Sequence, residues 1–450
     1  MTFWNVVMDF GIMSGLILLS QFLRARLTFM QSWFIPASLL AGLIGLLLGP
    51  NGLGIIPFSS AFGQYSGVLI ALVFAALPLS QEKSSAANEN VGKPVREMWS
   101  FQLIVFLGQH SMAMILGVLL FVPIFATPDG FGFMLPVGFV GGHGTAAAVG
   151  DSFAKLGWDE AMALGMTSAT VGILTGLFIG IALIKYGTIK GYASYISNFV
   201  DLPKSFRTGL IPSGEREEMG KETFSSISVD PLAMHAALLF FIVFCAKSIA
   251  DGVLLINKNF SLPIFSLSVL VGFLLMKILR MGGGEKYIDK KVITRLGSTF
   301  TDYLVGFGVA SITPSVVVSY ALPLTILFAF GVLYNFWLAL WFAPRVFTKD
   351  WFEKGIFTYG WASGVAAIGI TLLRVCDPNF KSTTLDDYSI SYLFSNMWGE
   401  LIIITFAPIM IANGLVLPYT GALVTALIIV VLVSWKVLKV FHAPIHKSTN

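Results

Sequence analysis

The stretch GFVGGHGTAAAVGDS, residues 138–152, places five glycines, a histidine and a threonine within an otherwise apolar part of the chain. Glycine lets the backbone turn sharply and lets a ligand approach it closely. At membrane depth, irregular backbone is tolerated only where protein or water satisfies its N–H and C=O groups. If the surrounding chain lies in a membrane, the stretch therefore predicts a break in the backbone at a functional site.

The composition indicates a membrane protein. Of the 450 residues, 56% are hydrophobic and only 12% are charged, and the mean hydropathy is +0.82. Soluble proteins carry about 25% charged residues. Apolar runs long enough to cross a lipid bilayer recur along the chain, which is typical of an all-α polytopic membrane protein. The net charge of +4 gives no reason to expect a nucleic-acid partner.

The placement of basic residues predicts the topology. We expect the Gly-rich segments 132–150 and 355–373 to be re-entrant hairpins, each entering and leaving on one side. With the N-terminus outside and the C-terminus inside, all 28 Lys and Arg residues fall in cytoplasmic loops except Lys155, Lys247 and Lys258, as the positive-inside rule requires. The expected spans are 7–23, 35–49, 67–80, 101–126, 161–184, 233–256, 262–280, 297–313, 320–343, 392–413 and 416–438.

An internal repeat divides the chain. WFIPASLLAGLIGLLLG (33–49) resembles FSLPIFSLSVLVGFLLM (260–276), and each is followed by two spans and a Gly-rich segment. Five spans plus a hairpin per half make the second repeat inverted, a recurring arrangement in secondary transporters. The expected parts are a first repeat (1–186), a cytoplasmic linker (187–230), a second repeat (231–413), and an extra C-terminal helix with a tail (414–450).

The two Gly-rich segments are expected to build the site. Opposed hairpin tips near the midplane form a site for a carboxylate and a small cation, because helix N-termini attract anions. Thr145 is expected to cap the outgoing helix. The alternative is that the glycines serve only tight helix packing. The candidate residues at the tips are Gly141, Gly142, His143, Gly144, Thr145, Ser363 and Gly364.

Ionisable groups within the spans are candidates for ion coupling. Asp302 stands near Thr301 and Ser311, and oxygen ligands of this kind suit sodium; it could equally carry a proton or form a buried hydrogen bond. Thr170 could supply a further oxygen. Lys247 and Asp251, four residues apart, are expected to pair on one helix face.

Several stretches resemble the bacterial sodium/glutamate symporter family. GGHGTAAAVGDSF (141–153) and SATVGILTGLFIGIAL (168–183) are similar to its first hairpin and the helix that follows. MWSFQLIVFLGQHSMAMILG (98–117) resembles its fourth span, and TRLGSTFTDYLVGFGVASI (294–312) the equivalent span of the second half. The second hairpin, TYGWASGVAAIGITLL (358–373), departs from the family pattern because it lacks the Thr-Pro-Thr step.

The resemblance implies a homodimer in the bacterial inner membrane, with a static scaffold and a mobile transport domain that carries the hairpins. Sodium entry would drive uptake of glutamate or a related anionic amino acid or carboxylate, with no cofactor beyond the coupling ion. It adds Gln109, with Asn335 as its counterpart in the second half, to the substrate-binding candidates. Glu400 joins the ion-coupling candidates, because the family has an acidic residue in a similar place.

Other classes of function are considered as well. The five histidines show no metal-binding spacing such as HExxH, and no Gly-x-Ser-x-Gly elbow occurs, so we do not expect an enzyme. For His143, a hydrogen bond at the tip or a substrate contact is expected rather than a metal. A proton-coupled transporter of another carboxylate, and a channel with re-entrant loops, remain alternatives.

Overall fold

The structure, a computed structural model, describes residues 3–32, 35–80, 92–195, 208–216, 218–256, 263–377, 381–394 and 396–444. Parts of the expected linker (196–207 and 217) and tail (445–450) lie outside these residues. The described chain is helical and contains no strand. It includes nine helices that are long and apolar enough to cross a membrane. The all-helical membrane class is therefore confirmed. The count of eleven spans stays a prediction, because the nine include Trp351–Cys376, expected as a hairpin, and do not include the expected spans 35–49, 297–313 and 392–413.

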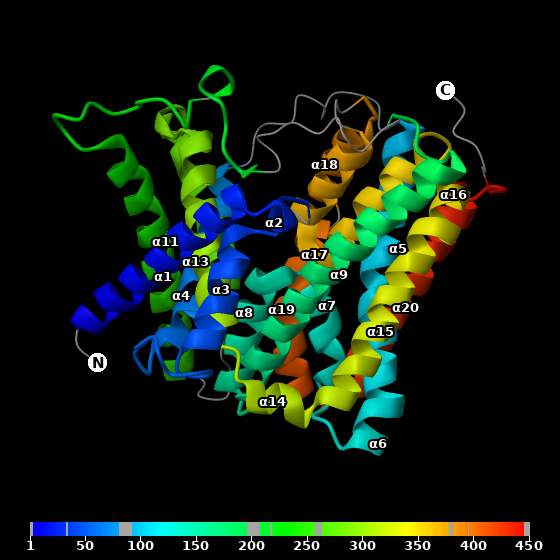
Figure 1. Ribbon diagram of the computed structural model, residues 1–450, viewed down its shortest axis with the longest axis horizontal. Helices are drawn as coiled ribbons and strands as arrows, with labels where there is room; N and C mark the ends of the chain where they lie inside the picture. Colours follow the sequence, from blue (N-terminus) through cyan, green and yellow to red (C-terminus); the bar gives the residue numbers. More distant parts are fainter. Residues whose placement is uncertain are drawn as a thin grey trace.

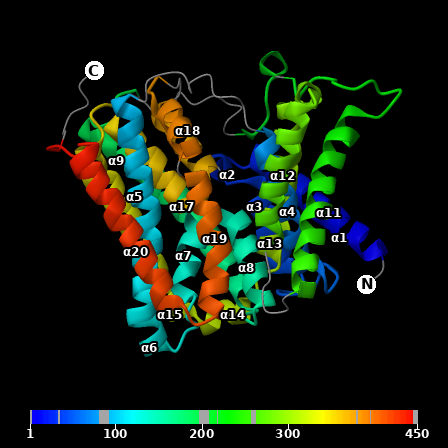
Figure 2. The same cartoon turned by 180° about the vertical axis from the view of Figure 1, so that it is seen from behind.

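The first helix group surrounds α13. Small residues let its neighbours approach closely: a Cβ added to Gly42 would lie 2.6 Å from Cβ of Val309, and one on Gly297 would lie 3.2 Å from Cβ of Ala76. Figures 1 and 2 show this group on one side of the molecule. Its members are α1 (Phe3–Arg26), α3 (Ala37–Leu48), α4 (Tyr65–Ser80), α11 (Pro231–Ile256), α12 (Ile264–Met281) and α13 (Lys290–Ala310).

The second helix group packs around α9, which contacts α7, α8 and α17 extensively. It holds helices from both halves of the chain, so the sequence halves and the two helix groups do not coincide (Figures 1 and 2). Its main members are α5 (Lys93–Leu116), α7 (Met134–Phe139), α8 (Gly142–Lys155), α9 (Ala161–Lys190), α15 (Ala321–Trp337), α17 (Trp351–Cys376), α18 (Thr384–Phe394), α19 (Asn396–Ala412) and α20 (Val416–Leu432).

Two helices of the second group end in the same unusual way. After α5 comes a π-helical turn, Gly117–Phe121, and then the short α6 (Val122–Phe125) with proline near its start. After α15 comes the π-helical turn Leu338–Phe342 and then α16 (Ala343–Val346), again with proline near its start. In Figure 1, α6 lies at the bottom and α16 at the top, so α5 and α15 run in opposite directions. The two segments therefore share the same local structure, a π-helical turn followed by a short helix with proline near its start.

Both Gly-rich segments are broken, as expected. Between α7 and α8 the chain turns at Gly141 and Gly142, which has φ +67°. Within α17, Gly364 (φ −153°, ψ 41°) and Val365 (φ 64°, ψ 172°) leave the helical conformation. A Cβ on Gly360 would lie 2.8 Å from Cα of Gly369, whereas nine residues of straight helix rise about 13.5 Å. The two halves of α17 therefore lie side by side.

The boundaries of both broken segments, and of the expected span 392–413, differ from the sequence expectation. The helix after the first break continues to Lys155, beyond the expected 150, and α17 covers Trp351–Cys376 rather than 355–373. The expected span 392–413 joins the end of α18 to α19. Ser395 lies between these two helices, outside the described residues.

Candidate functional site

A cavity of about 500 Å³ lies between the two helix groups. The first group contributes a largely apolar wall from three helices. The second group contributes the ionisable side chains His143 and Glu400, the hydroxyl of Thr145, and the rings of Trp361, Tyr388 and Tyr392. The first wall consists of Ile70, Val73, Phe74 and Leu77 of α4, Val269 and Phe273 of α12, and Thr301 and Val305 of α13.

The two backbone breaks meet at this cavity. Gly141, His143 and Gly144 line it from the first break, and residues 365–367 line it from the second. Gly142 lies against the side chain of Val365. Because α8 begins at Gly142 and the second half of α17 begins after Val365, two helix N-termini with unpaired backbone N–H groups reach the cavity.

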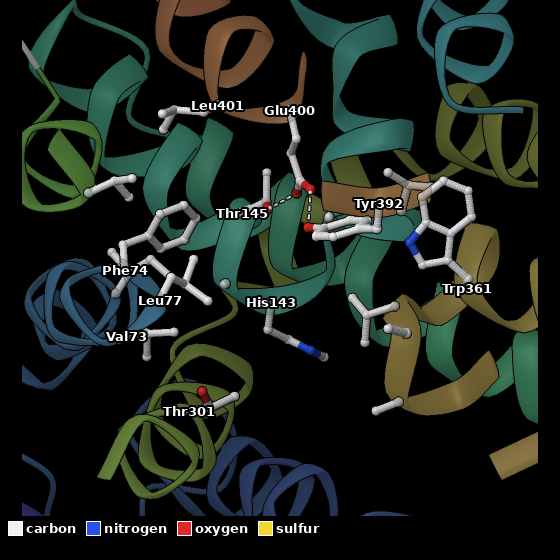
Figure 3. Close-up of a pocket in the computed structure, with 18 of the residues that line it drawn as sticks. Val73, Phe74, Leu77, His143, Thr145, Thr301, Trp361, Tyr392, Glu400 and Leu401 are labelled. Atoms are coloured by element: carbon white, nitrogen blue, oxygen red, sulfur yellow. Dashed lines mark hydrogen bonds between the residues drawn. The ribbon is translucent and has the colours of Figure 1, made fainter. Parts of the chain in front are cut away.

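Glu400 of α19 places its carboxylate in the cavity between two hydroxyl groups. Its Oε1 accepts a hydrogen bond from Thr145 Oγ1 at 3.3 Å, and its Oε2 accepts one from the hydroxyl of Tyr392 at 3.4 Å. Figure 3 shows these two contacts from α8 and α18 converging on the carboxylate. The arrangement brings together residues that are 255 positions apart in the chain.

The expectation that Thr145 caps the outgoing helix is wrong. The helix starts at Gly142, its N-cap is Gly141, and no side chain caps it. Thr145 lies inside the first turn, where its hydroxyl extends sideways to Glu400 instead of back to a backbone N–H. The residue is at the site as predicted, but the contact it makes there is a tertiary one.

A wall of aromatic rings adjoins Glu400. The rings of Tyr388 and Tyr392 lie 5.5 Å apart, and Trp361 lies 6.3 Å from Tyr388. All three line the cavity. The sequence analysis missed them, although the four-residue spacing of the two tyrosines on α18 would have placed them on one helix face.

Gln109, Asn335 and Ser363 do not line the cavity; they support the second break from behind. Gln109 Nε2 donates to Asn335 Oδ1 at 3.2 Å, and both side-chain amides donate to the carbonyl of Ala362, at 3.1 and 3.0 Å. Asn335 Nδ2 also donates to Ser363 Oγ at 3.0 Å. Gly364 is likewise absent from the described lining. Gln109 and Asn335, which the sequence analysis treats as counterparts in the two halves, contact each other directly.

His143 and Thr170 contact each other beside the cavity. Nε2 of His143 lies 3.1 Å from Oγ1 of Thr170, which also donates to the carbonyl of Met166. The histidine is 3% exposed and lines the cavity. Its Nδ1 is buried and has no hydrogen-bond partner among the described residues. One ring nitrogen thus contacts Thr170, and the other has no hydrogen-bond partner among the described residues.

The remaining ion-coupling candidates lie elsewhere. Asp302 lines a neighbouring cavity of about 320 Å³, which shares Val73, Leu77 and Thr301 with the central one. Ser311 ends α13, and its hydroxyl donates to the carbonyl of Gly308.

Lys247 and Asp251 form the expected ion pair, with Nζ 2.5 Å from Oδ2, and both side chains are more than half exposed. An exposed pair on the outer side of α11 contacts neither cavity. Its formation bears out the sequence expectation for these two residues.

The sequence pattern characteristic of sodium/glutamate symporters matches residues 4–364. The chain belongs to this family. The match covers the first helix group and the first break and ends at Gly364, within the second break. This match confirms the resemblance that residues 141–153 and 168–183 carry. A comparison with curated proteins found no match to the chain.

Membership of this symporter family makes the chain a membrane transporter and sodium its implied coupling ion. Tyr388, Tyr392 and Glu400 all lie beyond the matched residues. These side chains form a part of the cavity that the matched family pattern does not cover.

Proposed function

We propose that this protein is a sodium-coupled symporter of an amino acid or a related small carboxylate, which it carries in the cavity between the two helix groups. The observation that carries the proposal is the meeting of the two backbone breaks, Gly141–Gly142 and Gly364–Val365, at one cavity. Helix N-termini at membrane depth suit the carboxylate of a substrate. Glutamate, named in the description of the family, is the first substrate to test.

The proposed movement is of the elevator type. The second helix group, with both breaks as re-entrant hairpins, slides along the first group, which stays fixed. The contrast between the two cavity walls supports this division, because the wall from α4, α12 and α13 offers mainly apolar side chains. The second group can slide over such an apolar surface easily, because apolar side chains make no hydrogen bonds that have to break.

The opposite directions of α5 and α15 support two inverted repeats, and the matched π-helical turns support their equivalence. In the proposed assembly, two copies form a homodimer in the bacterial inner membrane through their first helix groups. The N-terminus lies outside and the C-terminus inside. The exposed apolar side chains of α11, such as Phe240 and Phe244, are available to lipid or to the second copy.

The position of Asp302 favours proton coupling as the second candidate. Its carboxylate lines a cavity that adjoins the central one, with hydroxyl groups from Ser298 and Thr301 beside it. A carboxylate in such a place can take up and release a proton. Under the sodium proposal, Asp302 is not required for the dependence of transport on sodium concentration.

Transport by the reconstituted protein tests the proposed function. Purified protein in liposomes is given labelled amino acids, with glutamate included, under an inward sodium gradient, an inward proton gradient, or no gradient. Sodium-driven accumulation above the outside concentration supports the proposal. Accumulation driven only by protons would select the Asp302 alternative, and passive equilibration of many solutes would indicate a channel.

A disulfide between the two helix groups tests the sliding movement. A Cβ on Gly67 of α4 would lie 3.6 Å from Cβ of Asp151 of α8, which suits a disulfide. With Cys245 and Cys376 replaced by serine and alanine, oxidation of Gly67→Cys/Asp151→Cys should abolish uptake, and reduction should restore it. The matched controls are the single variants Gly67→Cys and Asp151→Cys in the same background, which cannot form the bond and should keep their uptake after oxidation.

A further inference from the structure

Glu400 stands in the cavity as a carboxylate with unused hydrogen-bonding capacity. Its two described partners are the neutral hydroxyl groups of Thr145 and Tyr392, at 3.3 and 3.4 Å. An ionised carboxylate offers about four acceptor sites. Within the described residues, Glu400 forms no salt bridge. The described residues therefore leave acceptor sites of Glu400 open to a group bound in the cavity.

The aromatic side chains beside Glu400 suit a cation with an organic body. Tyr392 donates its hydroxyl to Glu400, while the rings of Tyr388 and Trp361 continue the wall. Figure 3 shows Tyr392 and Trp361 on one side of Glu400, with Phe74 across the cavity. An ammonium group gains both from a carboxylate and from the face of an aromatic ring.

The tips of the two breaks offer the complementary groups for a carboxylate. The first turn of α8 and residues 365–367 bring backbone N–H groups to the cavity. A carboxylate bound at these donors and an ammonium group bound at Glu400 are the two charged groups of a zwitterionic amino acid.

The rest of the lining selects the side chain of such an amino acid. Val73, Phe74 and Val269 face the cavity from the first group. No lysine or arginine contributes to the lining in the part of the chain that the structure describes. A second carboxylate, as in glutamate, would lose its water without meeting a lysine or arginine of the described lining, and Glu400 would repel it.

We propose that Glu400 binds the ammonium group of a zwitterionic amino acid with an uncharged, apolar side chain, and that the cavity disfavours glutamate. The proposal rests on the transport function proposed above for the same cavity. It makes Glu400 a substrate-binding residue that determines specificity, and not a ligand of the coupling ion.

Binding measurements on the purified protein test the substrate class independently of transport. In thermal-shift or calorimetric titrations with sodium present, L-leucine, L-methionine and L-phenylalanine should bind at least ten-fold more tightly than L-glutamate. The keto acid of leucine, which lacks the ammonium group, should bind at least ten-fold more weakly than leucine. Equal binding of the keto acid, tighter binding of glutamate, or no binding by any of the three apolar amino acids would each overturn the proposal.

The two proposals fail in different ways. If leucine binds selectively but sodium drives no accumulation, the transport function is wrong and the assignment of the cavity stands. If sodium drives accumulation of glutamate in preference to leucine, the transport function stands and the substrate class is wrong.

The variant Glu400→Gln separates the ammonium site from a sodium site. It should weaken leucine binding at least ten-fold at every sodium concentration, while the sodium concentration for half-maximal effect stays within two-fold. Recovery of leucine affinity at high sodium would show that Glu400 holds the ion and would overturn the proposal. The matched control is Glu160→Gln, which removes a carboxylate that also accepts a tyrosine hydroxyl, from Tyr320 at 2.6 Å, away from the cavity.

Two substitutions at Tyr392 give a readout that does not depend on the stability of the Glu400 variant. Tyr392→Phe keeps the ring and removes the hydroxyl, so leucine affinity should change by less than five-fold. Tyr392→Leu removes the ring and should weaken leucine at least five-fold more than Tyr392→Phe does. Equal affinity of the two variants would contradict a role for the aromatic wall in holding the ammonium group.

Discussion

Gly142 and Val365 touch where the two backbone breaks meet: a Cβ added to Gly142 would lie only 2.4 Å from Cγ1 of Val365. Both residues have positive φ, at 67° and 64°. For a β-branched residue such as valine, this conformation is a genuine outlier. Among the described residues, four non-glycines have positive φ, namely Ala126, Asp350, Val365 and Lys439, and of these Val365 lines the cavity.

Gly142→Ala should impair transport, because alanine is strained at positive φ and its Cβ would displace Val365. The backbone strain alone is about 1–2 kcal/mol. We expect sodium-driven uptake to fall at least ten-fold, with a lower melting temperature of the purified protein. Uptake is compared at equal amounts of reconstituted protein, and the melting temperature is measured on the purified protein.

A second substitution, at Val365 in the second break, tests whether the clash with Val365 explains the effect of Gly142→Ala. In Gly142→Ala/Val365→Gly, the contact is removed and the left-handed conformation at 365 is relieved, so part of the lost stability should return. Gly252→Ala is the control, since nothing lies within 4 Å of a Cβ there. An effect of Gly252→Ala as large as that of Gly142→Ala would contradict the prediction.

Gln109→Ala and Asn335→Ala should each destabilise the protein by about 1–3 kcal/mol, because each leaves a buried polar partner without its hydrogen bond. The double variant should cost less than the sum, since the hydrogen bond between the two amides is already lost in either single variant. Thermal or denaturant unfolding of the three variants measures this coupling.

The same variants distinguish a supporting role from a substrate contact. Because neither amide lines the cavity, KM should change less than the maximal uptake rate. A loss confined to KM, with unchanged stability, would restore the sequence expectation that Gln109 and Asn335 bind the substrate directly.

Lys354 and Asp387 form a buried ion pair between α17 and α18, with Nζ and Oδ2 2.8 Å apart and side-chain exposures of 0% and 7%. Lys354→Met leaves a buried carboxylate without its partner, which costs about 3–5 kcal/mol. Lys354→Met/Asp387→Leu should recover much of that loss. The measurement is the unfolding free energy in detergent.

An exposed pair provides the comparison. Lys155 and Asp151 are also joined by a salt bridge, but their side chains are 44% and 34% exposed. Lys155→Met should change stability by less than about 1 kcal/mol. Similar costs for the two lysine variants would show that burial does not decide the strength of these pairs.

Asp289, the N-cap of α13, should make stability depend on pH. Partial burial raises the pKa of this carboxyl, but the backbone N–H groups of Lys221, Val292 and Lys291 together lower the pKa further, to below its ordinary value. A lowered pKa in the folded state contributes stability above the unfolded value of about 3.9, and that contribution is lost as the pH falls through the folded pKa.

The expected outcome is a pH-dependent difference between Asp289→Asn and the unchanged protein. The asparagine keeps the cap and loses the charge, so the variant should melt at a lower temperature at pH 7. The difference should shrink below about pH 4. Asp289→Ala, which also loses the cap, should cost about 1 kcal/mol more. A difference that persists unchanged at pH 3 would refute the role of the charge.

The sequence by itself determined the membrane class and the positions of the breaks. Apolar length and scarce charge do not depend on packing, so the helices could be located from composition. The glycines at 141, 142 and 364 could be identified as breaks because backbone conformation is a local property. The same local pattern identified the family.

Only the tertiary structure decided what the broken segments contact. Thr145 reaches Glu400 across 255 positions, and Gln109 reaches Asn335 across 226. Local rules predicted a helix cap for Thr145, and the family resemblance implied a substrate contact for Gln109; packing gave each a different partner. Spacing along one helix identifies which residues share a face, but the neighbour of that face depends on how the helices assemble, which is why the aromatic wall around Glu400 became visible only in the fold.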